Sequence, residues 1–354
     1  MQSLDEKEWA HFKMPEVFDL IQRGKRLKNA DHIPGIVPYV SSTANNNGVD
    51  DYIEATPGTR VFGDCVSLAN SGSVGTAFYE PFEYVASDHV TALKTEGMSK
   101  HVYLFLTATI EKQGSNFNFN REINDARIKN MQIMLPVDDA DEPDYEYMAE
   151  YTRQKREAML DKYFEYAEER VAELGDIVDI PALDDKEWAE FRIGDLFEVS
   201  RPTARNKDKY QAGGVPFVAS GSVNNGVMKL CEPLDDEPLD KGGCITVSPV
   251  DGSTFYQPMD FLGRGGAGSS ILMLRCAGLN LYHGQFMARA IEQTCSKYTY
   301  GHMGNKDSIK RERIMLPVDD AGEPDYAYME QYAKNMMLRK YRQYLAFLER
   351  DAEE

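Results

Sequence analysis

The clearest pattern of hydrophobic positions lies between residues 144 and 174. This stretch contains no Pro or Gly, and its apolar side chains recur every three to four residues. The spacing predicts one amphipathic helix of roughly 45 Å, at about 1.5 Å per residue. Residues 325–349 repeat the pattern and predict a second helix. Gly175 is expected to end the first helix, and Pro181 marks the linker that follows.

The rest of the chain has a different pattern. It is rich in Gly, Pro, Asn and Ser, and short runs of β-branched and aromatic residues lie between these turn formers. Such runs predict short strands, which we expect at 36–40, 85–93, 102–110, 246–250 and 271–274. The predicted class is therefore α/β (α+β), with long helices following globular parts.

This organisation occurs twice, because the chain is an internal duplication. Residues 133–145 read IMLPVDDADEPDY and residues 314–326 read IMLPVDDAGEPDY, which differ only at Asp141 and Gly322. Shorter matches at nearly the same offset pair residues 8–10 with 187–189, 37–40 with 215–218, 46–49 with 224–227, and 78–81 with 255–258. Chance does not produce collinear matches of this kind. We expect globular parts at 1–137 and 184–318, and helical parts at 138–183 and 319–354.

Composition restricts the class of protein. The length of 354 residues suits two domains, and 42% hydrophobic residues suffice for their cores. No apolar run is long enough for a membrane helix, and residues 1–12 are polar and acidic, unlike a secretory signal. The chain has five widely spaced cysteines and no CxxC pair, so we expect no disulfide framework. Its six histidines lack the spacing of metal ligands, so we expect no metal site. We therefore expect a soluble protein of the reducing cytoplasm.

A net charge of −19 alone would argue against binding to nucleic acid, because phosphates are bound by Lys and Arg. The positions of the charges along the chain change this conclusion. Residues 136–183 and 317–354 carry −14 of this total, so the globular parts are nearly neutral. Basic residues recur at equivalent places in both copies: Arg23, Lys25, Arg26 and Lys28 with Arg201, Arg205, Lys207 and Lys209, and Arg121, Arg127 and Lys129 with Lys306, Lys310, Arg311 and Arg313. One such cluster alone is typical of a solvated surface. Their recurrence favours a basic face on each globular part.

The order of globular part, long helix, globular part and long helix resembles the specificity (S) subunit of type I restriction–modification systems, and of the related type IIB systems. The resemblance covers the whole chain. It rests on the repeated Ile-Met-Leu-Pro at 133–136 and 314–317, the polar approaches at 124–128 and 305–309, and the helices that follow. Many members carry Leu-Pro-Pro and then Glu-Gln, where this chain has Pro-Val-Asp-Asp-Ala. This departure favours a type IIB-like branch or an unusual type I branch.

The resemblance implies a function for each part. Each globular part would be a target-recognition domain that reads one half of a split site in double-stranded DNA. The two helices would pack as an antiparallel coiled coil and dock a DNA methyltransferase or a fused methyltransferase–nuclease. Catalysis, with S-adenosylmethionine and Mg²⁺, would belong to that partner, with no cofactor in this chain. Two readers on a rigid spacer suit half-sites about one duplex turn apart, roughly 34–36 Å.

Base contacts are expected from polar side chains on loops, because Asn can pair bidentately with adenine and Arg with guanine. The candidates in the first domain are Asn45, Asn46, Asn47, Arg60, Asn116, Asn118, Asn120 and Arg121. Those in the second are Ser220, Ser222, Asn224, Asn225, Tyr256, Arg264, Tyr300, His302 and Asn305. Asn-Asn-Gly is also typical of a plain tight turn, so both interpretations stand. The Lys and Arg clusters are expected to hold phosphates.

Partner contacts are expected from the Met-rich and Tyr-rich helix faces. The candidates are Met148, Met159, Tyr163, Met329, Met336, Met337 and Tyr341. The same side chains could be used entirely by the internal helix pair, and both interpretations stay open.

Other classes of protein fit less well. Residues 263–268 fit G-x-G-x-x-G, but a strand is expected after them where a dinucleotide site needs a helix. The chain has no phosphate-loop motif and no (D/N)PP(Y/F) of amino-methyltransferases, so no catalytic residue is assigned. An acidic protein–protein module, such as a DNA mimic or inhibitor, is the alternative. The total charge supports it, whereas the location of the acids on the helices does not.

Overall fold

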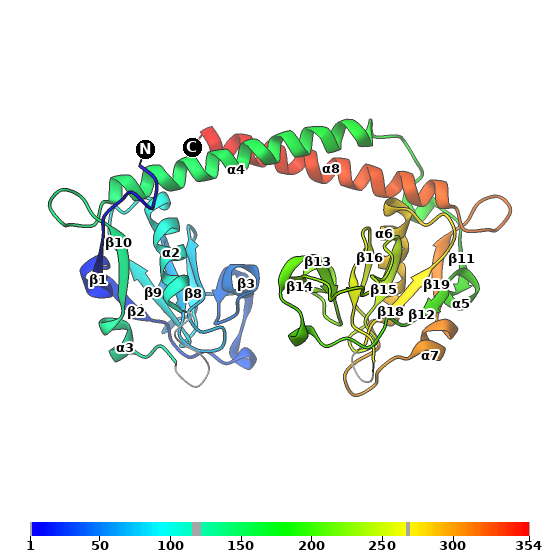
Figure 1. Cartoon of the computed structure of the whole chain (residues 1–354), viewed down its shortest axis with the longest axis horizontal. Coiled ribbons are helices and arrows are strands. Elements are labelled where there is room, and N and C mark those ends of the chain that lie inside the picture. The colour runs from blue at the N-terminus through cyan, green and yellow to red at the C-terminus, as the bar shows by residue number, and fades with distance from the viewer. Residues whose placement is uncertain (1, 115–121, 267–269, 354) are drawn as a thin grey trace. The chain divides into compact units, whose positions relative to one another are not determined.

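The computed structural model describes residues 2–114, 122–266 and 270–353 (Figure 1). The chain forms two compact units, unit 1 at Met1–Phe164 and unit 2 at Glu165–Glu354. The boundary between them falls inside one continuous helix, α4 (Tyr145–Leu174). In the part of the chain that the structure describes, no helix has the length and apolar character needed to cross a membrane.

The described residues of unit 1 form two four-stranded sheets and one two-stranded sheet. The elements before α4 are β1 (Trp9–Lys13), α1 (Met14–Val17), β2 (Leu20–Arg23), η1 (Asn29–Asp31), β3 (Pro34–Val40), η2 (Asn46–Gly48), β4 (Val49–Ile53), β5 (Val61–Phe62), β6 (Cys65–Ala69), β7 (Ala77–Glu80), β8 (Tyr84–Ala86), β9 (Val90–Lys94), α2 (Lys100–Gly114), α3 (Asp125–Asn130) and β10 (Gln132–Pro136). The strand orders are β2-β9-β6-β7, β4-β3-β8-β5 and β1-β10.

The side chains of unit 1 form its cores on both faces of the β2-β9-β6-β7 sheet. On one face, Val66 and Leu68 of β6 pack with Leu106 of α2. On the other face, Cys65 packs with Val40 of the second sheet. This alternation follows from the period of two along a strand, which sends successive side chains of β6 to opposite faces.

Unit 2 repeats the arrangement after the end of α4. Its elements are η3 (Leu183–Asp185), β11 (Trp188–Arg192), α5 (Ile193–Leu196), β12 (Glu198–Ser200), η4 (Lys207–Lys209), β13 (Ala212–Val218), η5 (Asn224–Gly226), β14 (Val227–Cys231), β15 (Cys244–Val247), β16 (Thr254–Gln257), β17 (Leu262–Gly263), β18 (Leu272–Arg275), α6 (Leu281–Cys295), α7 (Lys306–Arg311), β19 (Arg313–Pro317) and α8 (Tyr326–Glu353). The strand orders are β12-β18-β15-β16, β14-β13-β17 and β11-β19. The duplication is therefore structural as well as sequential.

The strand prediction at 102–110 is wrong, because these residues lie in helix α2. The buried positions are Val102, Tyr103, Phe105, Leu106 and Ile110, while Leu104 is exposed. This is helical spacing, and it outweighs the strand preference of the β-branched and aromatic residues. The run at 85–93 is two strands, β8 and β9, which belong to different sheets.

The long helices begin where the sequence predicts and α4 also ends there, whereas α8 continues to Glu353, beyond the expected end at residue 349. Asp144 Oδ1 accepts from the backbone N–H of Tyr147, and Asp325 Oδ1 accepts from that of Tyr328, both at 2.9 Å. These are N-cap contacts, which satisfy backbone donors that a helix leaves free at its start. Gly175 ends α4 with a φ of 76°, a conformation that glycine adopts without steric cost.

The predicted antiparallel packing is confirmed for the part of α4 that lies in unit 2. The hydroxyl groups of Tyr166 and Tyr341 are 3.3 Å apart. Further along, the side-chain amide of Asn335 donates to the backbone oxygen of Val178 at 2.7 Å. From Tyr166 to Val178 the residue numbers rise, while those of their partners fall from Tyr341 to Asn335. The two segments therefore run in opposite directions.

Candidate nucleic-acid interface

Unit 1 gathers several of the predicted basic side chains at one end. The guanidinium of Arg60 donates to the backbone oxygen of Arg23, the last residue of β2. Arg23 in turn lies 3.6 Å from the carboxylate of Asp125, the first residue of α3. Helix α3 lies at the end of unit 1 away from α4 (Figure 1). Three separate sequence segments therefore meet at this end, and their exposed side chains are Lys25, Arg26, Lys28, Arg60 and Lys129.

Unit 2 has an equivalent basic end. Arg201, Lys207 and Lys209 are exposed in the segment that follows β12. Helix α7, which carries Lys306 and Lys310, packs against α5 and β12. The two basic segments that the sequence pairs are thus carried by neighbouring elements in each unit.

Arg205 corrects the prediction that every member of these clusters is available for phosphates. Its side chain is only 2% exposed and is held by Glu237 at 2.7 Å and by Asp240 at 2.6 Å. It also donates to the backbone oxygens of Gly263 and Pro238. These four acceptors engage all three guanidinium nitrogens of a buried side chain, so Arg205 stabilises unit 2 from within and is not available for a phosphate.

The two Asn-rich segments form matching turns. In η2, Asn46 and Asn47 have φ values of 49° and 52°, and in η5, Asn224 and Asn225 have 49° and 53°. Asparagine is one of the few residues that adopt this left-handed region readily. The turn interpretation is therefore confirmed. The side chains of Asn45, Asn46, Asn47, Asn224 and Asn225 are also exposed, and base contact stays a prediction.

Two predicted base readers, Tyr256 and Asn305, make contacts within unit 2. The ring of Tyr256 lies against the backbone of α6, since a Cβ on Gly284 would meet it at 2.5 Å. It also packs on the core of unit 2. Asn305 caps α7, and its Oδ1 accepts from the backbone N–H groups of Asp307 and Ser308 at 2.9 and 3.0 Å. Tyr256 is thus held against the core, whereas Asn305 is exposed and uses only its Oδ1 in the cap, so base contact by Asn305 stays a prediction.

The remaining predicted readers are more open. Tyr300 is 82% exposed, Ser222 is exposed, and His302 is exposed with its ring stacked on Tyr298 at 5.9 Å. Ser220 and Arg264 are half-buried. The candidates Asn116, Asn118, Asn120 and Arg121 lie outside the described residues.

The predicted partner residues divide into buried and accessible ones. Met148 and Met329 are fully buried in the cores of units 1 and 2, so their assignment to a partner surface is wrong. Each faces inward because it lies on the first turn of its helix, over the end of the globular part. Met159 is 71% exposed, whereas Tyr163, Met336, Met337 and Tyr341 are half-buried.

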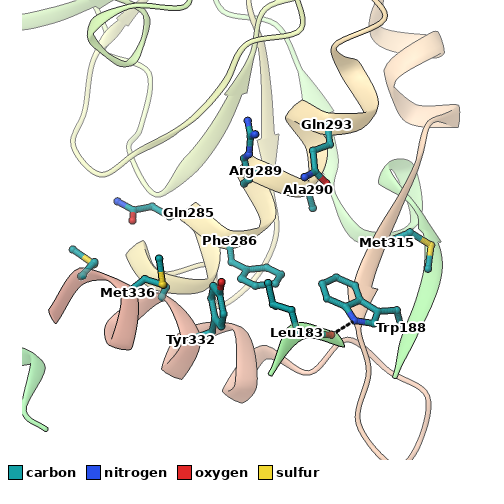
Figure 2. A pocket seen from close by; sticks show the side chains of 12 residues that line it. Leu183, Trp188, Gln285, Phe286, Arg289, Ala290, Gln293, Met315, Tyr332 and Met336 are labelled. Carbon is teal, nitrogen blue, oxygen red and sulfur yellow. Dashed lines mark hydrogen bonds between the residues drawn. The ribbon is translucent and has the colours of Figure 1, made fainter. Parts of the chain in front are cut away.

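Unit 2 carries an apolar pocket between α6, α8 and the β11-β19 sheet (Figure 2). Its floor is a row of three aromatic rings. Trp188 stacks on Phe286 at 6.2 Å, and Phe286 meets Tyr332 edge-on at 5.5 Å. The indole of Trp188 donates to the backbone oxygen of Leu183 at 2.9 Å, as Figure 2 shows. Met336 and Met337 line the same pocket.

Unit 1 repeats this pocket with equivalent residues. Trp9 stacks on Phe105 at 6.2 Å, Phe105 meets Tyr151 at 5.9 Å, and Trp9 donates to Leu4 at 3.0 Å. Met134 in unit 1 and Met315 in unit 2 line the pockets and are 40% and 50% exposed. We call these two sites the aromatic pockets. The equivalent positions of the two tryptophans were the sequence signal that could have found them.

Among the described residues, His, Cys, Asp and Glu form no group of three that could hold a metal ion. Two equivalent ion pairs, one in each unit, join a lysine to the aspartate that caps a long helix. Although burial opposes it, the hydrogen bond from Lys7 at 2.7 Å lowers the pKa of Asp144, and Lys186 does the same for Asp325 at 2.8 Å.

Comparisons with known proteins agree with the duplicated arrangement. The specificity subunit S.BcgI of the type II restriction enzyme BgcI from Heyndrickxia coagulans is 35% identical over 153 residues. These residues are 43% of this chain and 44% of the relative, so the match spans less than half of the relative's length.

Two solved structures align over most of the chain. The S subunit of a type I restriction–modification system from M. genitalium is 12% identical with a TM-score of 0.46, and the alignment covers 98% of this chain and 95% of that one. The HsdS subunit from Thermoanaerobacter tengcongensis is 15% identical with a TM-score of 0.31, covering 97% and 91%. At these values neither alignment establishes a common arrangement.

The family itself follows from the sequence match. The model described as "Type I restriction modification DNA specificity domain" matches residues 6–160 and residues 185–344, once in each copy of the duplication. The chain therefore belongs to the family of type I restriction–modification DNA specificity domains, with one such domain in each half.

Proposed function

We propose that this chain is the DNA-recognition subunit of a restriction–modification complex, and that each unit reads one half of a bipartite target in double-stranded DNA. The observation that carries the proposal is a repeated one. In each unit, exposed Lys and Arg side chains gather on neighbouring elements, and an exposed Asn turn is present at the equivalent place. Such a set can hold phosphates with its cations and read bases with its amides. Divergence between the copies would let the two halves of the target differ.

The chemistry is assigned to a partner and not to this chain. We propose a DNA methyltransferase, or a fused methyltransferase–nuclease, which would supply the sites for S-adenosylmethionine and Mg²⁺. The similarity to a specificity subunit of a type II enzyme favours the type IIB arrangement over type I. Work on chromosomal DNA in such a complex would take place in the cytoplasm.

The aromatic pockets are the proposed docking sites for that partner. The aromatic rings that form their floors are equivalent in both units, whereas the residues at their rims differ. Leu104 in unit 1 stands where unit 2 has Gln285, and Lys155 stands where unit 2 has Met336. A shared floor fits one partner surface that binds twice, presenting an apolar side chain to each pocket. The exposed Met134 and Met315 would be covered by this contact.

The proposal is tested by co-expressing the chain with the methyltransferase and mapping methylated bases in total DNA by long-read sequencing. We expect a split motif, with two specified halves around a fixed gap, that appears only when this chain is present. Removing four residues from the middle of α4 should change the gap and keep both halves. A stable complex that methylates nothing, or whose methylation falls when this chain is added, would favour the inhibitor instead.

A further inference from the structure

The two Asn turns rest on equivalent strands, β7 in unit 1 and β16 in unit 2. A Cβ on Gly48 would lie 3.5 Å from the ring of Phe78, and one on Gly226 would lie 3.7 Å from the ring of Phe255. An aromatic ring therefore supports each turn from below. Two residues further along each strand, and on the same face, the copies differ.

In unit 2 this next position is Gln257, and it holds the turn directly. Its side-chain amide donates to the backbone oxygen of Asn225 and to Thr246 Oγ1, both at 3.0 Å. Gln257 is only 5% exposed. The central residue of η5 is thus tied to the sheet beneath it by a hydrogen bond from a buried side chain.

In unit 1 the equivalent position is Glu80, which is fully buried. Its Oε1 accepts from the hydroxyl of Ser67 at 2.8 Å. Its Oε2 is buried and, among the residues that the structure describes, has no hydrogen-bond partner. An ionised carboxylate can only accept hydrogen bonds, whereas the neutral acid carries one O–H that can donate. A buried polar atom without a partner is costly, so the neutral acid with an acceptor is the stable arrangement here.

We propose that Glu80 is a positioning residue for the first Asn turn: it keeps its proton and donates from Oε2 to the backbone oxygen of Asn47, as Gln257 donates to Asn225. The inference rests on the proposed DNA-reading function of the turns. Recognition of one half-site would then depend on the protonation of Glu80, whereas recognition of the other would not.

The surroundings of Glu80 favour the neutral acid. Burial raises the pKa of Glu80 to about 7, and the hydrogen bond from Ser67 only partly opposes this. The titratable groups on the neighbouring strands are Cys65 of β6 and Tyr84 of β8, which lie 3.4 Å apart, and burial raises the pKa of both. The nearby cation, Lys94 of β9, donates to the backbone oxygen of Gly63 at 2.8 Å.

The sign of the pH dependence follows from this direction. Because the pKa of Glu80 is higher in the folded state than its usual 4.5, the stabilisation is complete below 4.5 and is lost as the pH rises through about 7. At pH 8 only about one tenth of the side chains would hold the proton. If that fraction alone holds the turn for reading, the affinity for the first half-site should fall about tenfold between pH 6 and pH 8.

The test uses the complete complex with its methyltransferase and a DNA duplex that carries the bipartite target, with dissociation constants measured from pH 6 to pH 8.5. Between pH 6 and pH 8, wild type should lose about tenfold of its affinity relative to Glu80→Gln, which should keep the low-pH affinity throughout. Glu80→Leu should bind weakly at every pH. The matched control is Gln257→Glu, which should create the same loss through the second half-site.

The outcomes separate this inference from the function on which it rests. Mutated target halves show which half-site a variant has lost, and thermal unfolding shows that each variant is folded. Equal pH profiles for wild type and Glu80→Gln would overturn the role of Glu80 while leaving DNA recognition intact. Failure of the wild-type complex to prefer the target at any pH would refute the proposed function itself.

Discussion

Replacing Arg205 distinguishes a buried structural cation from a DNA contact more sharply than any other single change. Its guanidinium is 2% exposed, and the carboxylates that hold it, on Glu237 and Asp240, are 16% and 13% exposed. Arg205→Ala leaves both half-buried carboxylates without their cation. Removing one partner from such a buried pair costs about 3–5 kcal/mol of folding free energy. We expect a loss near the lower end, about 3 kcal/mol, because water can reach both carboxylates.

The assay is urea unfolding followed by the fluorescence of Trp188, in a Trp9→Phe background so that unit 2 alone reports. The loss should shrink in acid. Although burial opposes it, hydrogen bonds from Arg205 and Tyr210 lower the pKa of Glu237, so this stabilisation is present above the usual carboxyl range and is lost as the pH falls. The matched control is Lys207→Ala, in the same segment but exposed, which should change stability by no more than about 0.5 kcal/mol.

DNA binding should separate these two variants in the opposite sense. Lys207→Ala should reduce the slope of log affinity against log salt by about 0.9, the contribution of one phosphate contact. Arg205→Ala, measured where it is still folded, should leave the slope unchanged. The reasoning would be refuted if Arg205→Ala left the unfolding free energy of unit 2 unchanged and reduced the salt slope, since Arg205 would then contact a phosphate.

Three further changes test other parts of the molecule. Asp325→Ala removes the cap of α8 and the partner of Lys186, and should cost about 1–2 kcal/mol in unit 2, measured by urea unfolding. Gly226→Ala places a Cβ 3.0 Å from a backbone oxygen at a φ of 74°, so it should weaken reading of the second half-site alone, seen by methylation mapping. Met315→Lys puts a charge in an aromatic pocket at a 50% exposed position; it should leave unfolding unchanged but reduce co-purification with the methyltransferase.

Sequence reasoning succeeded where a local pattern decides the structure. The duplication, the limits of α4, the start of α8, and the turns at Asn46 and Asn224 follow from repeats, helical spacing and turn chemistry. It failed at α2, because β-branched and aromatic residues suit a strand as well as a buried helix. It also assigned Arg205 to the surface, since its carboxylate partners lie 32 and 35 residues further along the chain.

The duplication also offers a comparison that the sequence alone does not explain. By the matching strand registers, Asp240 in unit 2, which binds the Arg205 guanidinium, stands where unit 1 has Phe62. The same fold is thus completed by an ionic cluster in one copy and by an apolar side chain in the other. Replacement of buried ion pairs by apolar residues is known to be compatible with stable folds, so both solutions are physically reasonable.

The pairing of the first and last strands of each globular part has a consequence for inheritance. Trp9 lies opposite Pro136, and Trp188 lies opposite Pro317, so the chain enters and leaves each globular part at one place. A segment whose ends are adjacent can be exchanged for another of the same kind without displacing what flanks it. A crossover within residues 133–145, or within residues 314–326, of two related genes would therefore join whole globular parts and leave each one intact.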